Sequence, residues 1–181
     1  MEKIKVLAIP GSLREKSLHR QLVRALSDLA PDNMEITIFE RHDVPVYNQD
    51  IEAEGFPPAV QALRDAIEAS DGLIFATPEF NGSMSGVIKN GIDWASRQGL
   101  LGKRPVTAIS GSPGSLGATK GQESLRACLN HLGMYVLARP SLAIPKMNDK
   151  LEDNTITDEA TAKFVSQWLE TFRDWIVQLN K

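Results

Sequence analysis

Short runs of apolar, mostly branched residues alternate along the chain with longer stretches in which apolar residues recur every three or four positions. The first pattern is typical of buried strands and the second of amphipathic helices. Residues 72–76 form an uninterrupted apolar run, as expected for a strand covered on both faces. The predicted strands are residues 4–9, 35–39, 72–76, 105–109 and 135–138.

Helical spacing follows each of the first four runs and ends the chain. The final stretch is the longest, and its aromatic residues predict a stripe that faces the core. Thr157 is the expected N-cap of this helix, with Asp158 and Glu159 in its first turn. The helical positions are Leu18, Leu22, Leu26 and Leu29; Val60, Leu63 and Ile67; residues 87–94; Leu125, Leu129 and Leu132; and Phe164, Trp168, Phe172, Trp175 and Leu179.

Alternating strands and helices predict an α/β protein with a parallel, doubly wound sheet and helices on both faces. We expect one domain over residues 1–181, with a polar connection at 40–57 and a short polar loop at 146–154. Open sheets of this kind bind ligands at the carboxyl ends of their strands. The loops after the first, third and fourth strands are therefore the places to look for chemistry.

Composition narrows the possible classes of protein. The chain has 181 residues, a formal net charge of −3 and a single cysteine, Cys128. A lone cysteine excludes an intrachain disulfide and fits a reducing compartment, so we expect a cytoplasmic protein. The chain has neither the basic charge typical of nucleic-acid binding nor an apolar run long enough to cross a membrane.

The loop after the first strand carries residues suited to a phosphate group. Ser12 and Ser17 offer hydroxyls, and Arg14 offers a planar set of donors. A helix beginning near Ser17 would point free backbone N–H groups at the same place. The alternative is that Ser17 only caps the helix and Arg14 is an ordinary surface residue.

The loop after the third strand has the composition of a shaped, backbone-presenting loop. Pro78, Gly82 and Gly86 favour such a conformation, while Asn81 and Ser83 add side-chain hydrogen bonds. It could present polar groups to the edge of a flat heteroaromatic ring. An ordinary strand-to-helix connection remains the alternative.

Residues around this loop have simpler roles. We expect Glu79 to orient the loop or to accept from a backbone N–H. Trp94 is predicted to pack, and Lys89 is predicted to pair with Asp93 on one helix face.

Other reactive residues do not form a recognisable catalytic or metal site. His19, His42 and His131 lack metal-ligand spacing. Cys128 lies beside an apolar helical stripe and is expected to be a buried, inert thiol. We assign no protein nucleophile, acid or base.

Three motifs in order resemble one known family. They are Gly-Ser-Leu-Arg-x-x-Ser at 11–17, Pro-Glu-Phe-Asn-Gly-Ser at 78–83 with Lys-Asn-Gly-Ile-Asp-Trp at 89–94, and Gly-Ser-Pro-Gly-Ser-Leu-Gly at 111–117. The chain resembles the NADPH-dependent FMN reductases, flavodoxin-like reductases of quinones, chromate and azo dyes. The resemblance implies a five-stranded sheet in the order 2-1-3-4-5 with non-covalent FMN.

The resemblance also implies a set of cofactor-binding residues. The phosphate would lie at the first loop, the flavin ring against the second, and the third would approach the ring from its other edge. The predicted set is Ser12, Arg14, Ser17, Leu18, His19, Pro78, Glu79, Phe80, Asn81, Ser83, Ser110, Gly111 and Ser112.

The implied activity is ping-pong electron transfer through FMN. NADPH or NADH would be the donor, and a small molecule such as a quinone, flavin, azo dye or chromate would be the acceptor. A homodimer or homotetramer is implied as well. The alternatives are an FMN electron carrier without NAD(P)H oxidation and a sensor of a phosphorylated metabolite.

Three positions depart from the family pattern. Asparagine is usual at His19, tyrosine at Phe80 and glycine at Ala118. A histidine changes its charge near neutral pH, so FMN affinity is expected to depend on pH. The methyl group of Ala118 is expected to narrow the approach of a ligand or a subunit.

Overall fold

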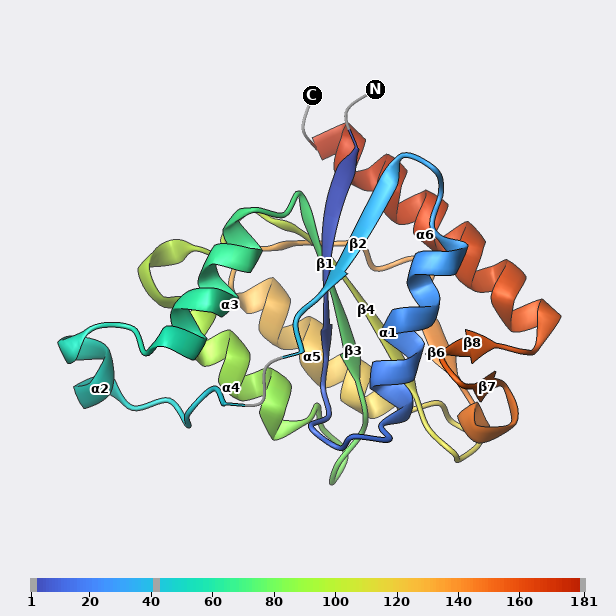
Figure 1. Ribbon diagram of the computed structural model, residues 1–181, viewed down its shortest axis with the longest axis horizontal. Helices are drawn as coiled ribbons and strands as arrows, with labels where there is room; N and C mark the ends of the chain where they lie inside the picture. The colour runs from blue at the N-terminus through green and yellow to red at the C-terminus, as the bar shows by residue number, and fades with distance from the viewer. Residues whose placement is uncertain (1–2, 41–42, 180–181) are drawn as a thin grey trace.

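A parallel sheet forms the centre of the molecule in the computed structural model, which describes residues 3–40 and 43–179 (Figure 1). Its strand order, β2-β1-β3-β4-β5, is the predicted one. The predicted boundaries of the first four strands hold to within one or two residues. The strands are β1 (Ile4–Pro10), β2 (Met34–Ile38), β3 (Gly72–Thr77), β4 (Pro105–Gly111) and β5 (Tyr135–Val136).

The strand predicted at 135–138 is shorter than expected. β5 covers two residues, and a separate strand β6 (Leu142–Ile144) then pairs with the carboxyl half of β4. Pro140 lies between them and has no N–H to continue a ladder. The fifth position of the sheet is therefore shared by two short strands.

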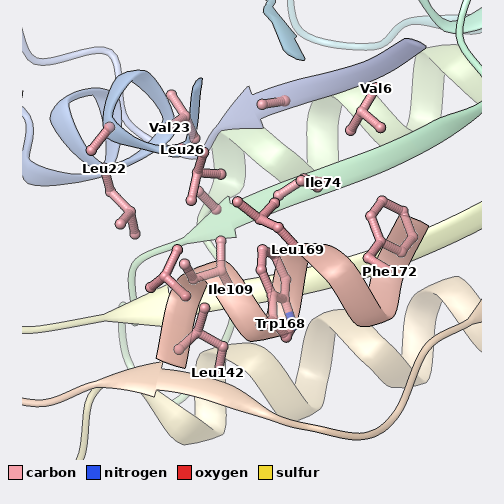
Figure 2. Close-up of a cluster of buried hydrophobic side chains, with 14 of the residues drawn as sticks. Val6, Leu22, Val23, Leu26, Ile74, Ile109, Leu142, Trp168, Leu169 and Phe172 are labelled. Carbon is pink, nitrogen blue, oxygen red and sulfur yellow. The ribbon is translucent and has the colours of Figure 1, made fainter. Parts of the chain in front are cut away.

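Helices cover both faces of the sheet, because successive side chains of each strand point to opposite sides. Val6 packs with α1 (Leu18–Leu29) and α6 (Glu159–Leu179). Its neighbour Leu7 packs on the other face, with α3 (Pro58–Glu68), α4 (Gly86–Ala95) and α5 (Thr119–His131). Figure 2 shows how Trp168 and Phe172 of α6 pack under the strands.

Two connections that were predicted as polar loops contain regular secondary structure. Within 40–57 lies helix α2 (Gln49–Glu54), capped by the side chain of Asn48, which accepts from the Asp50 N–H. The loop predicted at 146–154 runs instead into a hairpin, β7 (Leu151–Glu152) and β8 (Thr155–Ile156). Its turn residues, Asp153 and Asn154, both have positive φ, which aspartate and asparagine tolerate better than most residues.

The apolar stripe of α6 is rotated from the predicted one. Trp168 and Phe172 are buried as expected, but Phe164 is 41% exposed and Trp175 is only partly buried. The cap is also one residue later than predicted: the Asp158 carboxylate, not Thr157, accepts from the Thr161 N–H at 2.9 Å. The side chains that α6 buries fully are Val165, Trp168, Leu169, Phe172 and Ile176.

Candidate functional site

The loops after β1, β3 and β4 meet at one edge, because these three strands are neighbours in the sheet. The first two loops are in contact. The Gly11 N–H donates to the Ala76 carbonyl at 2.8 Å, and a Cβ at Gly11 would lie 2.9 Å from Pro78 Cδ and 2.8 Å from Ser85 Oγ. Only glycine fits at this contact, so Gly11 allows the loop after β1 to pack against the loop after β3.

The β1–α1 loop ends in a capped helix N-terminus. Ser17 is the N-cap of α1, and its Oγ accepts from the His19 N–H at 3.2 Å. The Ser17 N–H donates to the Arg14 carbonyl, and the Arg14 N–H donates weakly to Ser12 Oγ at 3.4 Å. Ser17 is therefore a helix cap as the alternative interpretation held, with a hydroxyl hydrogen still able to donate. The Arg14 side chain is exposed beside this N-terminus, which is a favourable place for an anion.

His19 is buried in the first turn of α1 and is only 6% exposed. Burial lowers the pKa of His19 from 6.5 to about 4; the backbone of Gly111 and of Thr77 opposes this shift, and the charge of Arg14 adds to it. The imidazole is therefore neutral at neutral pH, so the expected change of charge near pH 7 is wrong. Its Nε2 is buried without a hydrogen-bond partner among the described residues. Leu18, just before it, packs against the core.

The β3–α4 loop is a preorganised turn rather than an ordinary connection. Phe80 and Ser83 exchange two backbone hydrogen bonds of 3.0 and 3.1 Å. Asn81 and Gly82 between them have φ values of 54° and 72°. Positive φ at both central positions is the property of a type I′ turn, for which Asn-Gly is the preferred sequence. The turn leaves Phe80 58% exposed, with Asn81 and Ser83 also exposed at its tip.

Glu79 joins this turn to the neighbouring helix. Its Oε2 accepts from the N–H groups of Lys120 and Gly121 at 3.0 and 3.2 Å. The expectation that Glu79 accepts from backbone N–H groups is confirmed. Pro78, the residue before it, is buried.

The β4–α5 loop is shaped by contacts within the protein. Ser110 is fully buried, and its hydroxyl donates to the Gly117 carbonyl at 2.8 Å. A Cβ at Gly111 would lie 2.5 Å from Met147 Sδ, so any larger residue here would have to displace the buried Met147 side chain. Ser112 is half-buried, and Leu116 is 69% exposed on the same loop.

Packing roles predicted near the site are also confirmed. Trp94 is fully buried, and its indole donates to the Pro45 carbonyl at 2.8 Å. Lys89 pairs with Asp93 at 2.6 Å. Cys128, predicted to be buried, is only partly buried; this burial still raises the pKa of its thiol, which favours the protonated, unreactive form.

Metal-binding and membrane-spanning features are absent from the described residues. Within 3–40 and 43–179, no three His, Cys, Asp or Glu side chains are grouped to hold a metal ion; His42 lies outside these ranges. None of the helices in the same ranges is long and apolar enough to cross a membrane.

A cavity of about 400 Å³ that the sequence did not predict lies beside the first loop. Of the predicted cofactor-binding residues, Ser12 lines it. Its wall is mostly apolar and comes from β1, from the segment after β2 and from the start of α4; Leu13, Phe39, Val46 and Val87 belong to it. Nothing in the spacing of these residues along the sequence indicated that they enclose a common space.

Known proteins match the chain over nearly its whole length. Residues 4–149 match the family model described as NADPH-dependent FMN reductase. An NAD(P)H-dependent FMN reductase of Pseudomonas aeruginosa is 37% identical over 183 residues, covering 99% of this chain and 98% of the relative. A quinone reductase of Pseudomonas putida is 36% identical over 179 residues, covering 97% and 96%.

The solved structure of FerB, an NAD(P)H:(acceptor) oxidoreductase from Paracoccus denitrificans, superimposes with a TM-score of 0.88. It is 37% identical and covers 97% of this chain and 98% of its own. Fold and matches together define a flavodoxin-like flavin oxidoreductase. The chain belongs to the NADPH-dependent FMN reductase family. The predicted fold, the NAD(P)H-dependent oxidoreductase activity and the FMN cofactor are thereby confirmed.

Proposed function

We propose that the three loops hold FMN in the way the motifs imply. The phosphate lies at the N-terminus of α1, held by Ser12, Arg14 and Ser17, with Leu18 and His19 in the same helical turn. The observation that carries this proposal is the exposed Arg14 guanidinium next to a helix N-terminus at the carboxyl edge of the sheet. Both features attract a phosphate dianion, so the residues present fit the group.

The flavin ring lies between the second and third loops in this proposal. The turn at 78–83 supplies Pro78, Glu79, Phe80, Asn81 and Ser83, mostly through backbone groups. From the other edge, the end of β4 supplies Ser110, Gly111 and Ser112. The protein side chains bind and orient, while bound FMN supplies the hydride and electron chemistry. No protein acid or base is assigned.

The reaction we propose is a ping-pong transfer. NAD(P)H binds against the flavin site, gives up its hydride equivalent and leaves before a small acceptor enters the same place. A quinone is the proposed acceptor class, supported by the quinone reductase relatives, with flavins, azo dyes and chromate as further candidates.

We further propose that the protein acts in the cytoplasm as one domain assembled into a homodimer or homotetramer. Support comes from exposed apolar side chains on the loops at the carboxyl edge, Phe80 and Leu116, and from the exposed Val46 in the segment before α2. A subunit contact would remove the apolar surface of these side chains from water, which is favourable.

The test is an absorbance spectrum of the purified protein, with FMN added if it is colourless, followed by anaerobic NADPH and then NADH. We expect a flavin spectrum that bleaches with one of the two donors and recovers on adding a quinone. A bound flavin that neither donor reduces would make the protein an electron carrier. No FMN binding at all would overturn the proposal and leave the first loop as a site for another phosphate.

A further inference from the structure

The first two turns of α5 hold the β3–α4 loop at several points. Glu79 Oε2 accepts from the Lys120 and Gly121 N–H groups at 3.0 and 3.2 Å. Ser124 Oγ accepts from the Met84 N–H at 2.7 Å. These contacts join residues about forty positions apart, and they lie on both sides of the turn at 80–83.

Close packing accompanies these hydrogen bonds. A Cβ at Gly121 would lie 2.8 Å from the Pro78 carbonyl oxygen and 3.1 Å from Glu79 Cα. Glycine at 121 therefore lets the helix approach the loop closely enough for the Glu79 carboxylate to reach its amides. An alanine here would force loop and helix apart.

Glu79 replaces a cap that α5 lacks. The N-cap position of α5 is Ala118, which has no side chain able to accept a hydrogen bond. The N–H groups of the first turn, which have no partner within the helix, donate instead to the Glu79 carboxylate from the β3–α4 loop. Two N–H donors on one carboxylate at the positive end of a helix dipole make a strong contact.

The position of this contact relates it to the flavin site. The turn at 78–83 is one proposed wall of the ring site, and the loop that leads into α5 is the other. Glu79 thus joins the first wall to the start of α5, the helix that follows the second wall. The proposed phosphate site, in contrast, lies at the N-terminus of α1, on a different helix.

We propose that Glu79 is a positioning residue that fixes the separation of the two ring walls through α5 and so controls the rate of flavin reduction more than the affinity for FMN. The inference rests on the function proposed above. It assigns Glu79 no proton transfer and no direct contact with the donor.

The experiment compares Glu79→Ala and Glu79→Gln with the wild type, and uses Glu123→Gln as the control. Glu123 is an exposed carboxylate in the same part of α5 and takes no part in the proposed site. Three quantities are measured: hydrogen exchange of the apo-protein, the FMN dissociation constant, and the rate of flavin reduction by NAD(P)H in a stopped-flow instrument.

For Glu79→Ala we expect faster exchange at the Lys120 and Gly121 amides. Reduction should slow by about 10- to 100-fold, the effect of misplacing reacting groups by about an ångström. FMN affinity should change by only about threefold, because the phosphate contacts supply most of the charge-assisted binding. Glu79→Gln keeps an acceptor oxygen and should recover most of the rate.

Separate outcomes identify which idea fails. If the wild type binds no FMN, the proposed function fails and the role of Glu79 falls with it. If the wild type is reduced normally and Glu79→Ala is reduced at the same rate despite faster amide exchange, Glu79 is only a helix cap. If rate and FMN affinity fall in proportion, or Glu79→Gln is as slow as Glu79→Ala, the positioning role is also wrong.

Discussion

At the scale of single residues, the polar side chains near the carboxyl edge divide by what they bind. Ser17, Ser110 and Glu79 make hydrogen bonds to backbone groups and thereby shape their loops. Arg14 and Asn81 are exposed and face solvent. The predicted cofactor set groups all five together, but their contacts within the protein differ: the first three hold the loops in shape, whereas the last two make no such contact with the described residues and are exposed where we propose that FMN binds.

Because of His19, the free energy of unfolding of the protein should fall at acidic pH. Its folded pKa of about 4 is below the value of 6.5 expected when unfolded, so the unfolded chain binds more protons between these values. Stability is therefore lost as the pH falls from 6.5 toward 4. At 1.36 kcal/mol per pKa unit the loss reaches about 3 kcal/mol.

Urea unfolding of the wild type and of His19→Asn, each near neutral pH and at about pH 4.5, measures this effect. The wild type should lose about 2–3 kcal/mol more than the variant over this interval. Parallel losses in the two proteins would show that His19 titrates normally in the folded state.

Gly117 and Ala118 are neighbours in the same left-handed backbone region, with φ of 63° and 62°. Ala118→Gly should raise the free energy of unfolding by about 0.5–1 kcal/mol, because glycine adopts positive φ without steric cost. Gly117→Ala should lower it by more than about 2 kcal/mol. There a Cβ would lie 2.9 Å from the Ile144 carbonyl carbon.

Chemical denaturation of both variants gives the two values. Opposite signs are expected, and a loss of stability in Ala118→Gly would mean that the methyl group is worth more in packing than its backbone strain costs.

At the scale of elements, α6 shows why a stripe read from the sequence can be rotated. Residues spaced by four advance about 40° around a helix at each step, because a turn has 3.6 residues. Phe164, Trp168 and Phe172 therefore drift, and Phe164 ends about 100° from Val165, one of the buried side chains. The spacing of the aromatic residues predicted that Phe164 faces the core, whereas the buried face is centred on Val165, Phe172 and Ile176.

Truncating two phenylalanines of α6 tests this face. Phe172→Ala should cost about 3–5 kcal/mol of folding free energy, the usual loss for a fully buried aromatic ring. Phe164→Ala, the matched control, should cost much less, about 1 kcal/mol, because Phe164 is 41% exposed. Thermal or urea unfolding of the two variants measures both free energies. Similar losses of stability in the two variants would contradict the burial pattern of α6.

Buried strands and amphipathic helices were predictable because their apolar periodicity is set by the sheet and the core. Short elements were not, because local backbone chemistry determines them. The hairpin at 151–156 depends on positive φ at Asp153 and Asn154, and α2 depends on the Asn48 cap. The turn at 80–83 had a usable signal in Asn81-Gly82, but its anchoring by Glu79 required knowing that α5 lies beside it.

At the scale of the whole molecule, the sheet brings distant sequence to one place. Register pairs Pro10 with Ala76 and Thr77 with Ser110, so three strand ends are level although they span about a hundred residues. A ligand that contacts all three loops binds only the folded protein, because the three loops are not close together in the unfolded chain. Cofactor binding and global stability are consequently linked.

FMN should therefore stabilise the whole fold. At a free concentration one hundred times its dissociation constant, FMN should add about 2.7 kcal/mol to the free energy of unfolding. For a chain of this size that corresponds to a rise in Tm of roughly 5–10 °C.

Arg14→Ala should lose most of this gain at the same FMN concentration, because a charge-assisted hydrogen bond contributes about 1.5–3 kcal/mol. The apo-protein should keep its Tm, since the Arg14 side chain is exposed. Lys16→Ala, an exposed cation on the same loop outside the motif, is the control and should keep the full rise.

Differential scanning fluorimetry or calorimetry with and without FMN measures all three proteins. An unchanged rise in Arg14→Ala would remove Arg14 from the phosphate site, while an equal loss in Lys16→Ala would show that the loop attracts FMN only through its general charge.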